Sequence, residues 1–388
     1  MTSTPFSVSV PDDDVRRLRL RIAETRWAEP IGAVDWEAGT DPVELRRLAD
    51  HWATGFDWRA HEAAINELPA FTTDISGARV HYLRFEAERP GGLPLVVTHG
   101  WPSTFLELTE LARRLSRPSE YGHPDADAHT VIVPSLPGFA FSEARPVFPS
   151  DVPTHELWHR LMHDELGFER YGAHGGDLGA GVTSRLGQAH PESVAGIHVL
   201  AVAPPARFDD ATLTDEERDF LAAGAEWTAD EGAYQHQQQS RPMSLAPALS
   251  DSPVGLLAWI VEKYRAWSDS HGDLSSRFSD EFVLAQASLY WHTNTISTSF
   301  RPYAEHARGF STPVSRVDVP TAVAVFPADL AQPPRSWAER TYNVQRYTPM
   351  PRGGHFAAHE EPDLLADDVR AFFASLSGTS PPEKGASR

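Results

Sequence analysis

The sequence predicts an α/β protein with a mostly parallel central sheet, a helical extension before the sheet and a helical insertion within it. From about residue 78, short β-branched or apolar runs alternate with helical stretches, which is typical of βαβ units. The alternation stops between residue 205 and about residue 312, where apolar residues recur at helical spacing. It resumes at "VPTAVAVFPADL", residues 319–330. A single sheet interrupted by one long helical insertion explains all three observations.

The N-terminal part of the chain, residues 1–77, is predicted to be a helical segment packed on the core. Apolar residues recur at helical spacing over residues 13–27 and 43–67, with Arg, Glu and Asp interleaved. No strong strand pattern precedes residue 78. We therefore expect the sheet to begin after this segment.

The core is predicted to consist of two parts, residues 78–204 and 313–377. In the first part the expected strands are the runs "ARVHYLRF", "LPLVVTHG", "TVIVPSLP", "RYGAHGGD" and "VAGIHVLA". We expect the insertion, residues 205–312, to follow the sixth strand and to form a helical lid. The last residues, 378–388 with sequence "GTSPPEKGASR", have the composition of a disordered tail.

Composition excludes several classes of function. The 388 residues carry a net charge of −20, which would repel nucleic acid and anionic membranes, so a neutral or apolar small molecule is the expected partner. The absence of cysteine excludes disulfides, a thiolate nucleophile and cysteine-based metal sites. No signal peptide pattern opens the chain, and no run approaches the roughly 18 apolar residues of a spanning helix. We therefore expect a cytoplasmic location.

One aspartate stands in a frame of small residues, "RYGAHGGDLGAG" at residues 170–181. The frame Gly175-Gly176-Asp177-Leu178-Gly179 matches the strand-to-helix elbow that usually carries a nucleophilic serine. A carboxylate at this position can attack carbon and form an ester, which divides one difficult displacement into two easier steps. Taken alone, Asp177 is explained as well by the preference of aspartate for glycine turns. Which interpretation holds depends on whether the chain also supplies a catalytic acid and base for Asp177.

Two later residues complete a predicted catalytic triad. In α/β-hydrolases the nucleophile, the acid and the base follow one another along the chain. Asp329 ends the apolar run "VAVFPADL", and His355 lies in the glycine-rich loop "MPRGGHFAAHEEP". Asp329 alone could be a helix N-cap, and His359, one turn beyond His355, competes for the role of base. The order of the three residues predicts an α/β-hydrolase fold.

An oxyanion hole is the fourth predicted element of the site. In "VVTHGWPST", Trp101 follows a strand, where hydrolases of this fold place a loop that donates a backbone N–H. The second donor is the N–H of the residue after the nucleophile, here Leu178. A plain Gly-Pro turn is the structural alternative for this loop.

Together these motifs resemble the epoxide hydrolases, specifically the microsomal-type branch. The similarity rests on HGWP, GGDLG, FPADL and GGHFAAHEEP, and it covers almost the whole chain because "WRAHEAAINELP" resembles that branch's N-terminal segment. The matching positions in that segment are Trp58, Arg59, Glu62, Asn66 and Pro69. Within the branch, the chain is most similar to actinomycete enzymes of enediyne antibiotic pathways.

The resemblance also implies two lid tyrosines that bind the epoxide oxygen, at Tyr234 and Tyr303. A strained ether leaves poorly as a naked alkoxide, so a positioned phenol must donate to it. Tyr264 and Tyr290 are alternatives, although their helical spacing suits core aromatics. With Trp101, the two lid tyrosines are the predicted substrate-binding residues. One departure is Leu178, because the family usually has Trp there, which leaves the pocket wall beside the nucleophile undefined.

The segment "HELWH", His155 to His159, matches the H-E-x-x-H pattern of zinc proteases. His163 adds a third imidazole on the same helical face. However, the segment lies just before the elbow strand, where the fold needs a packing helix, and such proteases take their third ligand from beyond the helix. We therefore predict no metal and no cofactor.

The predicted activity is hydrolysis of an epoxide to a vicinal diol through a hydroxyalkyl ester of Asp177, within secondary metabolism. A haloalkane dehalogenase would use the same nucleophile, but Leu178 lacks the side-chain N–H that most often stabilises a halide there. A non-catalytic ligand-binding protein of the same fold is the third alternative, and an intact triad argues against it. The sequence is compatible with a homodimer but does not specify the assembly state.

Overall fold

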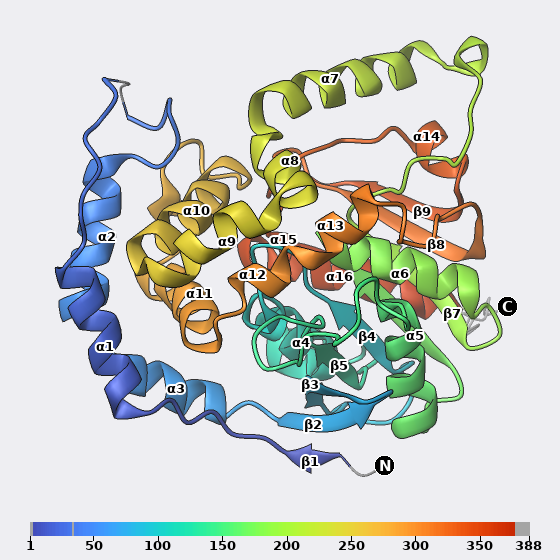
Figure 1. Ribbon diagram of the computed structural model, residues 1–388. Helices are drawn as coiled ribbons and strands as arrows, with labels where there is room; N and C mark the ends of the chain where they lie inside the picture. The colour runs from blue at the N-terminus through green and yellow to red at the C-terminus, as the bar shows by residue number, and fades with distance from the viewer. Residues whose placement is uncertain (1–2, 33–34, 377–388) are drawn as a thin grey trace, which may run out of the picture.

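The computed structural model describes residues 3–32 and 35–376. The tail predicted for residues 378–388 lies outside the described residues. A nine-stranded sheet runs through the molecule in the order β1-β2-β3-β5-β4-β6-β7-β8-β9 (Figure 1). Its strands are β1 Thr4–Pro5, β2 Ala70–Ile75, β3 Ala78–Phe85, β4 Leu95–Thr98, β5 Val131–Pro134, β6 Tyr171–Gly175, β7 Val194–Val199, β8 Val317–Val325 and β9 Tyr342–Pro349.

The sheet is parallel from β5 to β9 and antiparallel between β1 and β3, and β3 pairs antiparallel with β5. Parallel strands covered on both faces are expected to be apolar throughout, and every residue of β4, β5, β6 and β7 is buried. This confirms the predicted α/β fold with a mostly parallel sheet. The carboxyl ends of the parallel strands meet at one edge, where the candidate site lies.

Helices cover both faces of the sheet. Within β7, Gly196 faces Phe372 of α16 (Pro362–Leu376), whereas the next residue, Ile197, faces Gly187 of α6 (Asp177–Ala189). Because neighbouring residues of a strand point to opposite faces, α16 and α6 lie on opposite sides. The remaining helices of the core are α4 Thr109–Ser116, α5 Thr154–His159, α14 Arg335–Glu339 and α15 Ala357–Glu360, with helical turns at Phe105–Leu108, Pro118–Tyr121 and Arg160–Glu165.

The N-terminal extension differs from its prediction in containing strands. Its helices are α1 Asp12–Ala23, α2 Pro42–Thr54 and α3 Trp58–Asn66. The helix expected over residues 43–67 is divided, because Asp57 accepts hydrogen bonds from Arg59 and Ala60 and so caps a new helix. Strands β1 and β2 also belong to this segment, so the prediction that the sheet begins at residue 78 is wrong. Strand β2 forms through pairing with β3, which the local pattern of residues 70–75 does not reveal.

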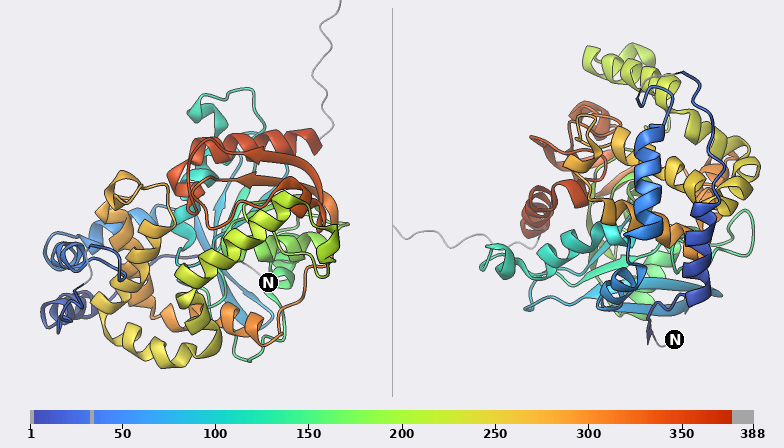
Figure 2. Two further views of the ribbon diagram at one scale, coloured as in Figure 1. Left: turned by 90° about the horizontal axis from the view of Figure 1, so that it is seen from above. Right: turned by 90° about the vertical axis from the view of Figure 1, so that its left-hand side faces the viewer.

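The helices of the extension contact the insertion. Trp52 of α2 is buried and donates its indole N–H to Ser288 Oγ, at 2.9 Å. His51 and His61 contact the two carboxylate oxygens of Glu281, at 2.8 and 2.6 Å. Figures 1 and 2 show α1 and α2 lying along the side of the insertion. The helices of the extension therefore lie against the insertion, and the extension joins the core through β1 and β2.

The insertion follows β7, which is the sixth strand if the two-residue β1 is left out of the count. Helices α10 (Pro253–Ala266) and α11 (Asp280–Thr293) are apolar on most of their surface, as expected of helices that pack on each other and on α2 of the extension. The helices of the insertion are α7 Asp215–Glu231, α8 Ala233–Ser240, α9 Pro242–Asp251, α10 Pro253–Ala266, α11 Asp280–Thr293, α12 Ile296–Ser299 and α13 Arg301–Ala307, with short turns at Asp210–Thr212 and Leu274–Ser276.

In the part of the chain that the structure describes, no single helix is long and apolar enough to cross a membrane. Helices α9 and α10 reach the necessary length and apolar character only when they are taken together, and they are bent by 116° relative to each other.

Candidate active site

Asp177 lies at a sharp turn between β6 and α6. Its backbone φ is +46°, in the left-handed region that non-glycine residues seldom adopt. The turn needs small neighbours: a Cβ on Gly179 would lie 2.1 Å from the Thr98 carbonyl oxygen, and a Cβ on Gly100 would lie 2.4 Å from the Asp177 Cβ. The frame of small residues in the sequence therefore has a steric cause, and it exposes the Asp177 carboxylate above the sheet edge.

The structure brings Asp177, Asp329 and His355 together. His355 Nδ1 lies 2.6 Å from Asp329 Oδ1, and its Nε2 lies 3.5 Å from Asp177 Oδ2. Asp329 follows β8 and His355 follows β9, so adjacent parallel strands deliver the two residues to the same edge. The next helix, α14, begins only at Arg335 and has Pro334 as its N-cap, which excludes the interpretation of Asp329 as a helix N-cap.

The loop that carries His355 is anchored by the insertion. The backbone N–H of His355 donates to the Trp267 carbonyl, at 2.8 Å, and the N–H of Gly353 donates to Asp269 Oδ2, at 2.9 Å. Arg277 pairs with the same Asp269 carboxylate, at 2.9 Å. Sequence reasoning missed Trp267 and Asp269, since they lie more than 80 residues from the loop and form no local motif.

Burial and neighbouring groups shift the pKa of His355 in opposite directions, and the same is true of Asp177. Burial favours neutral His355, but the carboxylates of Asp329 and Asp177 outweigh it and raise the pKa of His355 well above its usual value. Burial likewise opposes ionisation of Asp177, but His355 and the N–H groups of Trp101 and Leu178 hold the pKa of Asp177 below its usual value. Asp177 is therefore an ionised carboxylate at neutral pH.

Both predicted oxyanion donors face Asp177. The N–H of Trp101 donates to Asp177 Oδ1, at 2.8 Å, and the N–H of Leu178 donates to the same carboxylate. Oδ1 of Asp177 is thus held by the Trp101 N–H, and Oδ2 faces His355. Donors that already hold the carboxylate are placed to hold the charge that develops when its carbonyl is attacked.

Tyr234 of α8 and Tyr303 of α13 lie opposite the nucleophile. The Tyr234 ring stacks on Trp101 at 5.3 Å between centroids, and the Tyr303 ring meets Trp101 edge-on at 6.0 Å. The Tyr303 hydroxyl faces that of Tyr234 but, among the described residues, has no partner in hydrogen-bond geometry. Burial and the charge of Asp177 raise the pKa of both phenols, so both remain protonated donors.

Comparisons with known proteins agree with this geometry. Residues 3–108 match the family described as "Epoxide hydrolase N terminus", and residues 94–293 match "alpha/beta hydrolase fold". Epoxide hydrolase 1 of Sus scrofa is 34% identical over 406 residues, which cover 96% of this chain and 88% of the relative. The chain is a microsomal-type epoxide hydrolase.

Two solved structures of epoxide hydrolases share the whole architecture. The structure of Aspergillus niger epoxide hydrolase aligns with a TM-score of 0.84 and 30% identity, covering 97% of both chains. Juvenile hormone epoxide hydrolase from the silkworm Bombyx mori aligns with a TM-score of 0.87 and 28% identity, covering 97% of this chain and 95% of that one. The N-terminal extension and the insertion are therefore shared features of this family.

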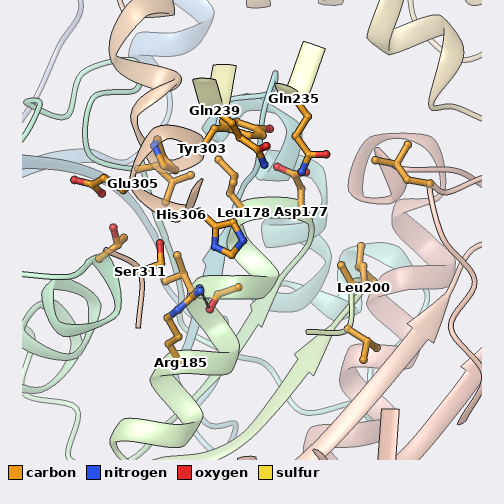
Figure 3. Close-up of a pocket in the computed structure, with 18 of the residues that line it drawn as sticks. Asp177, Leu178, Arg185, Leu200, Gln235, Gln239, Tyr303, Glu305, His306 and Ser311 are labelled. Atoms are coloured by element: carbon orange, nitrogen blue, oxygen red, sulfur yellow. Dashed lines mark hydrogen bonds between the residues drawn. The ribbon is translucent and has the colours of Figure 1, made fainter. Parts of the chain in front are cut away.

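The epoxide hydrolase has a pocket of about 450 Å³ above Asp177. Its wall beside the nucleophile is aliphatic, formed by Leu178 with Val182 and Leu200. Leu178, the departure from the family pattern, thus lines the pocket with its side chain, while its backbone N–H serves the oxyanion hole. Figure 3 shows Leu178 and Asp177 beside Tyr303, with Gln235 and Gln239 above them.

The residues that competed for catalytic roles lie elsewhere in the epoxide hydrolase. His359 stacks on Phe282, at 3.8 Å between centroids, and so packs away from Asp177. Tyr290 donates to the Ser103 carbonyl at 3.1 Å, and Tyr264 stacks on Phe356. Neither tyrosine lines the large pocket, so both are core aromatics.

The "HELWH" segment forms α5, which packs against α6. The His159 ring stacks face to face on His190, at 3.6 Å between centroids, and its Nδ1 lies 3.0 Å from the Tyr171 hydroxyl. Glu156 contacts His190 Nε2 at 3.0 Å. Over residues 3–32 and 35–376, no group of three or more His, Asp or Glu side chains could hold a metal ion.

Proposed function

We propose that this epoxide hydrolase opens its substrate through a covalent ester on Asp177. The proposal rests on the observation that the two oxygens of the Asp177 carboxylate have different partners. Oδ1 accepts a hydrogen bond from the Trp101 N–H, and the Leu178 N–H also stabilises the charge of the carboxylate, whereas Oδ2 is 3.5 Å from His355 Nε2. Across the pocket stand two protonated phenols, those of Tyr234 and Tyr303.

In the first step, an oxygen of Asp177 attacks an epoxide carbon, and the carbon–oxygen bond of the ring breaks. The departing oxygen carries the electron pair of that bond and takes a proton from Tyr234 or Tyr303. The product is a hydroxyalkyl ester of Asp177. No metal or cofactor takes part in this step.

In the second step, neutral His355 takes a proton from water, and the hydroxide adds to the ester carbonyl of Asp177. The N–H groups of Trp101 and Leu178 hold the resulting oxyanion, and Asp329 stabilises the imidazolium. Collapse breaks the bond to the alkyl oxygen, which takes a proton from His355 and leaves as the diol. The Asp177 carboxylic acid released in this step then loses its proton and the tyrosinate formed in the first step gains one, by exchange with solvent, so that both groups return to their starting states.

A dehalogenase-like reaction is the second candidate, because the same aspartate would displace a halide. One observation favours it: the indole Nε1 of Trp101 is a buried donor without a hydrogen-bond partner among the described residues. Two phenols are nevertheless better suited to a leaving oxygen, which needs a proton, than to a halide, which does not. The relatives of this chain are epoxide hydrolases as well.

The pocket volume and its aliphatic wall favour aryl and bulky alicyclic epoxides as substrates. Participation in enediyne biosynthesis, a cytoplasmic location and a homodimer remain predictions from the sequence. The proposed activity is tested by assaying diol formation from such epoxides, with and without EDTA. We expect diol from the parent in both conditions and none from Asp177→Ala. Turnover by Asp177→Ala, or release of halide in preference to diol from matched substrates, would contradict the proposal.

A further inference from the structure

A second, small cavity lies behind the nucleophile. It measures about 20 Å³, enough for a single water molecule. Asp177 and His355 line both this cavity and the large pocket, whereas Ser103 and Glu107 line only the small one. A molecule in the small cavity therefore reaches Asp177 from a different side than the epoxide does.

Glu107 brings a buried acid to this cavity. It lies in the helical turn Phe105–Leu108, directly after the loop that supplies the Trp101 oxyanion donor, and it is only 8% exposed. Its carboxyl group lies near the Ser103 side chain, and among the described residues no basic side chain forms an ion pair with it. Burial raises the pKa of Glu107 to about 7, and the nearby charges of His355 and Asp177 act on it in opposite directions. The catalytic steps described above give this residue no role.

We propose that the small cavity binds the hydrolytic water of the second step and that Glu107 is the positioning residue that orients it. This inference rests on the proposed ester mechanism. The water donates one O–H to an oxygen of Glu107 and the other to His355 Nε2. These two hydrogen bonds direct a lone pair of the water oxygen at the Asp177 carbonyl carbon. His355 removes the proton, and Glu107 neither gains nor loses one. An unprotonated oxygen of the carboxyl group accepts the hydrogen bond whether Glu107 is charged or neutral.

A bound water needs two to four polar partners, and the cavity provides them. Besides Glu107 and His355, its wall includes the Ser103 side chain and His174 of β6. His174 Nδ1 lies 3.0 Å from His198 Nδ1, and burial among these groups lowers the pKa of His174 well below its usual value. His174 is therefore a neutral wall of the cavity and does not compete with His355 for the proton.

Glu107→Met removes the hydrogen-bond acceptor at nearly constant volume, and Glu107→Gln keeps a carbonyl acceptor in the same place. We expect Glu107→Met to leave the rate of ester formation within about threefold of the parent and to slow ester hydrolysis about tenfold or more. Both rates come from single-turnover reactions quenched over time and analysed by mass spectrometry. Glu107→Gln should recover most of the hydrolysis rate.

Steady-state kinetics provide a second readout. Slower ester hydrolysis lowers kcat and KM together and leaves kcat/KM unchanged, because kcat/KM reports only the steps up to ester formation. General damage to the site would instead lower kcat/KM. The matched control is Gln286→Met. Gln286 lines neither cavity, and its side chain is a buried hydrogen-bond acceptor for Thr104, which lies in the loop that carries Trp101. We expect this control to keep the parent's ratio of the two rates.

Two results would overturn the inference while the ester mechanism stands: parent-like ester hydrolysis in Glu107→Met, or equal slowing of both steps. Absence of any ester in all variants would instead refute the proposed mechanism. A crystal structure of the parent tests the inference without any substitution. It should show a water oxygen within about 3.2 Å of a Glu107 oxygen, and a well-ordered cavity without one would contradict the inference.

Discussion

His355 Nδ1 lies 2.6 Å from Asp329 Oδ1, so the imidazole is held with its other nitrogen toward Asp177. Asp329 fixes both the orientation and the tautomer of the base, since an Nδ1–H that donates to a carboxylate leaves Nε2 free to accept a proton.

We therefore expect Asp329→Asn to lower the rate of diol formation roughly 10²-fold or more, because an amide can hold the wrong tautomer and cannot stabilise the imidazolium. The loss should fall on ester hydrolysis, so the ester should accumulate in single-turnover reactions. A variant with the parent's hydrolysis rate would show that Asp329 has no such role.

The pH dependence of ester hydrolysis follows from the two carboxylates beside His355. Both raise its pKa in the free enzyme, and esterification removes the charge of Asp177. Because neutral imidazole is the base, the hydrolysis rate should fall as pH falls through the pKa of His355. That pKa should be lower in the ester than in the free enzyme. NMR titration of the free enzyme and pH-dependent single turnovers measure the two values, and equal values or a rate that rises on acidification would contradict the account.

Tyr234→Phe and Tyr303→Phe should each slow ester formation roughly 10²-fold or more, since each removes a donor to the leaving oxygen. Tyr264→Phe is the matched control, because this phenol is buried in the core and lies outside the large pocket. The control should react like the parent. Unchanged ester formation in the double variant Tyr234→Phe/Tyr303→Phe would remove the tyrosines from the mechanism.

Leu178→Trp introduces the residue that the sequence resemblance leads us to expect after the nucleophile. The backbone donor is retained, but the larger ring occupies part of the pocket beside Asp177. We expect kcat/KM to fall for bulky alicyclic epoxides and to change little for small terminal ones. Equal changes for both substrate sizes, measured by diol formation, would show that this wall does not select by size.

The residues of the triad could be located from sequence because the fold ties each to a local pattern. The elbow needs glycines around Asp177 for steric reasons, Asp329 follows an apolar strand, and His355 lies in a glycine-rich loop after the last strand. The ordering of these motifs along the chain predicted that they would meet. Their catalytic roles remain to be tested by the variants above.

Features that depend on distant pairing could not be predicted in this way. Strand β2 is defined by its register with β3, and α2 is buried by α10 and α11, which come much later in the chain. Glu107 belongs to none of the sequence motifs, and only the packed structure places it in the cavity behind Asp177. The surroundings of these residues are set by contacts with segments that are distant in the sequence, and no local motif indicates such contacts.

The central claim is that Asp177 becomes covalently attached to the substrate while His355 serves only the second step. His355→Gln should therefore accept a reactive epoxide but fail to release the diol. Digestion and mass spectrometry should show the peptide containing Asp177 heavier by one substrate mass, and Asp177→Ala in the same background should abolish this adduct. If the peptide stays unmodified while the parent opens the same epoxide under the same conditions, Asp177 is not a covalent nucleophile and the account is wrong.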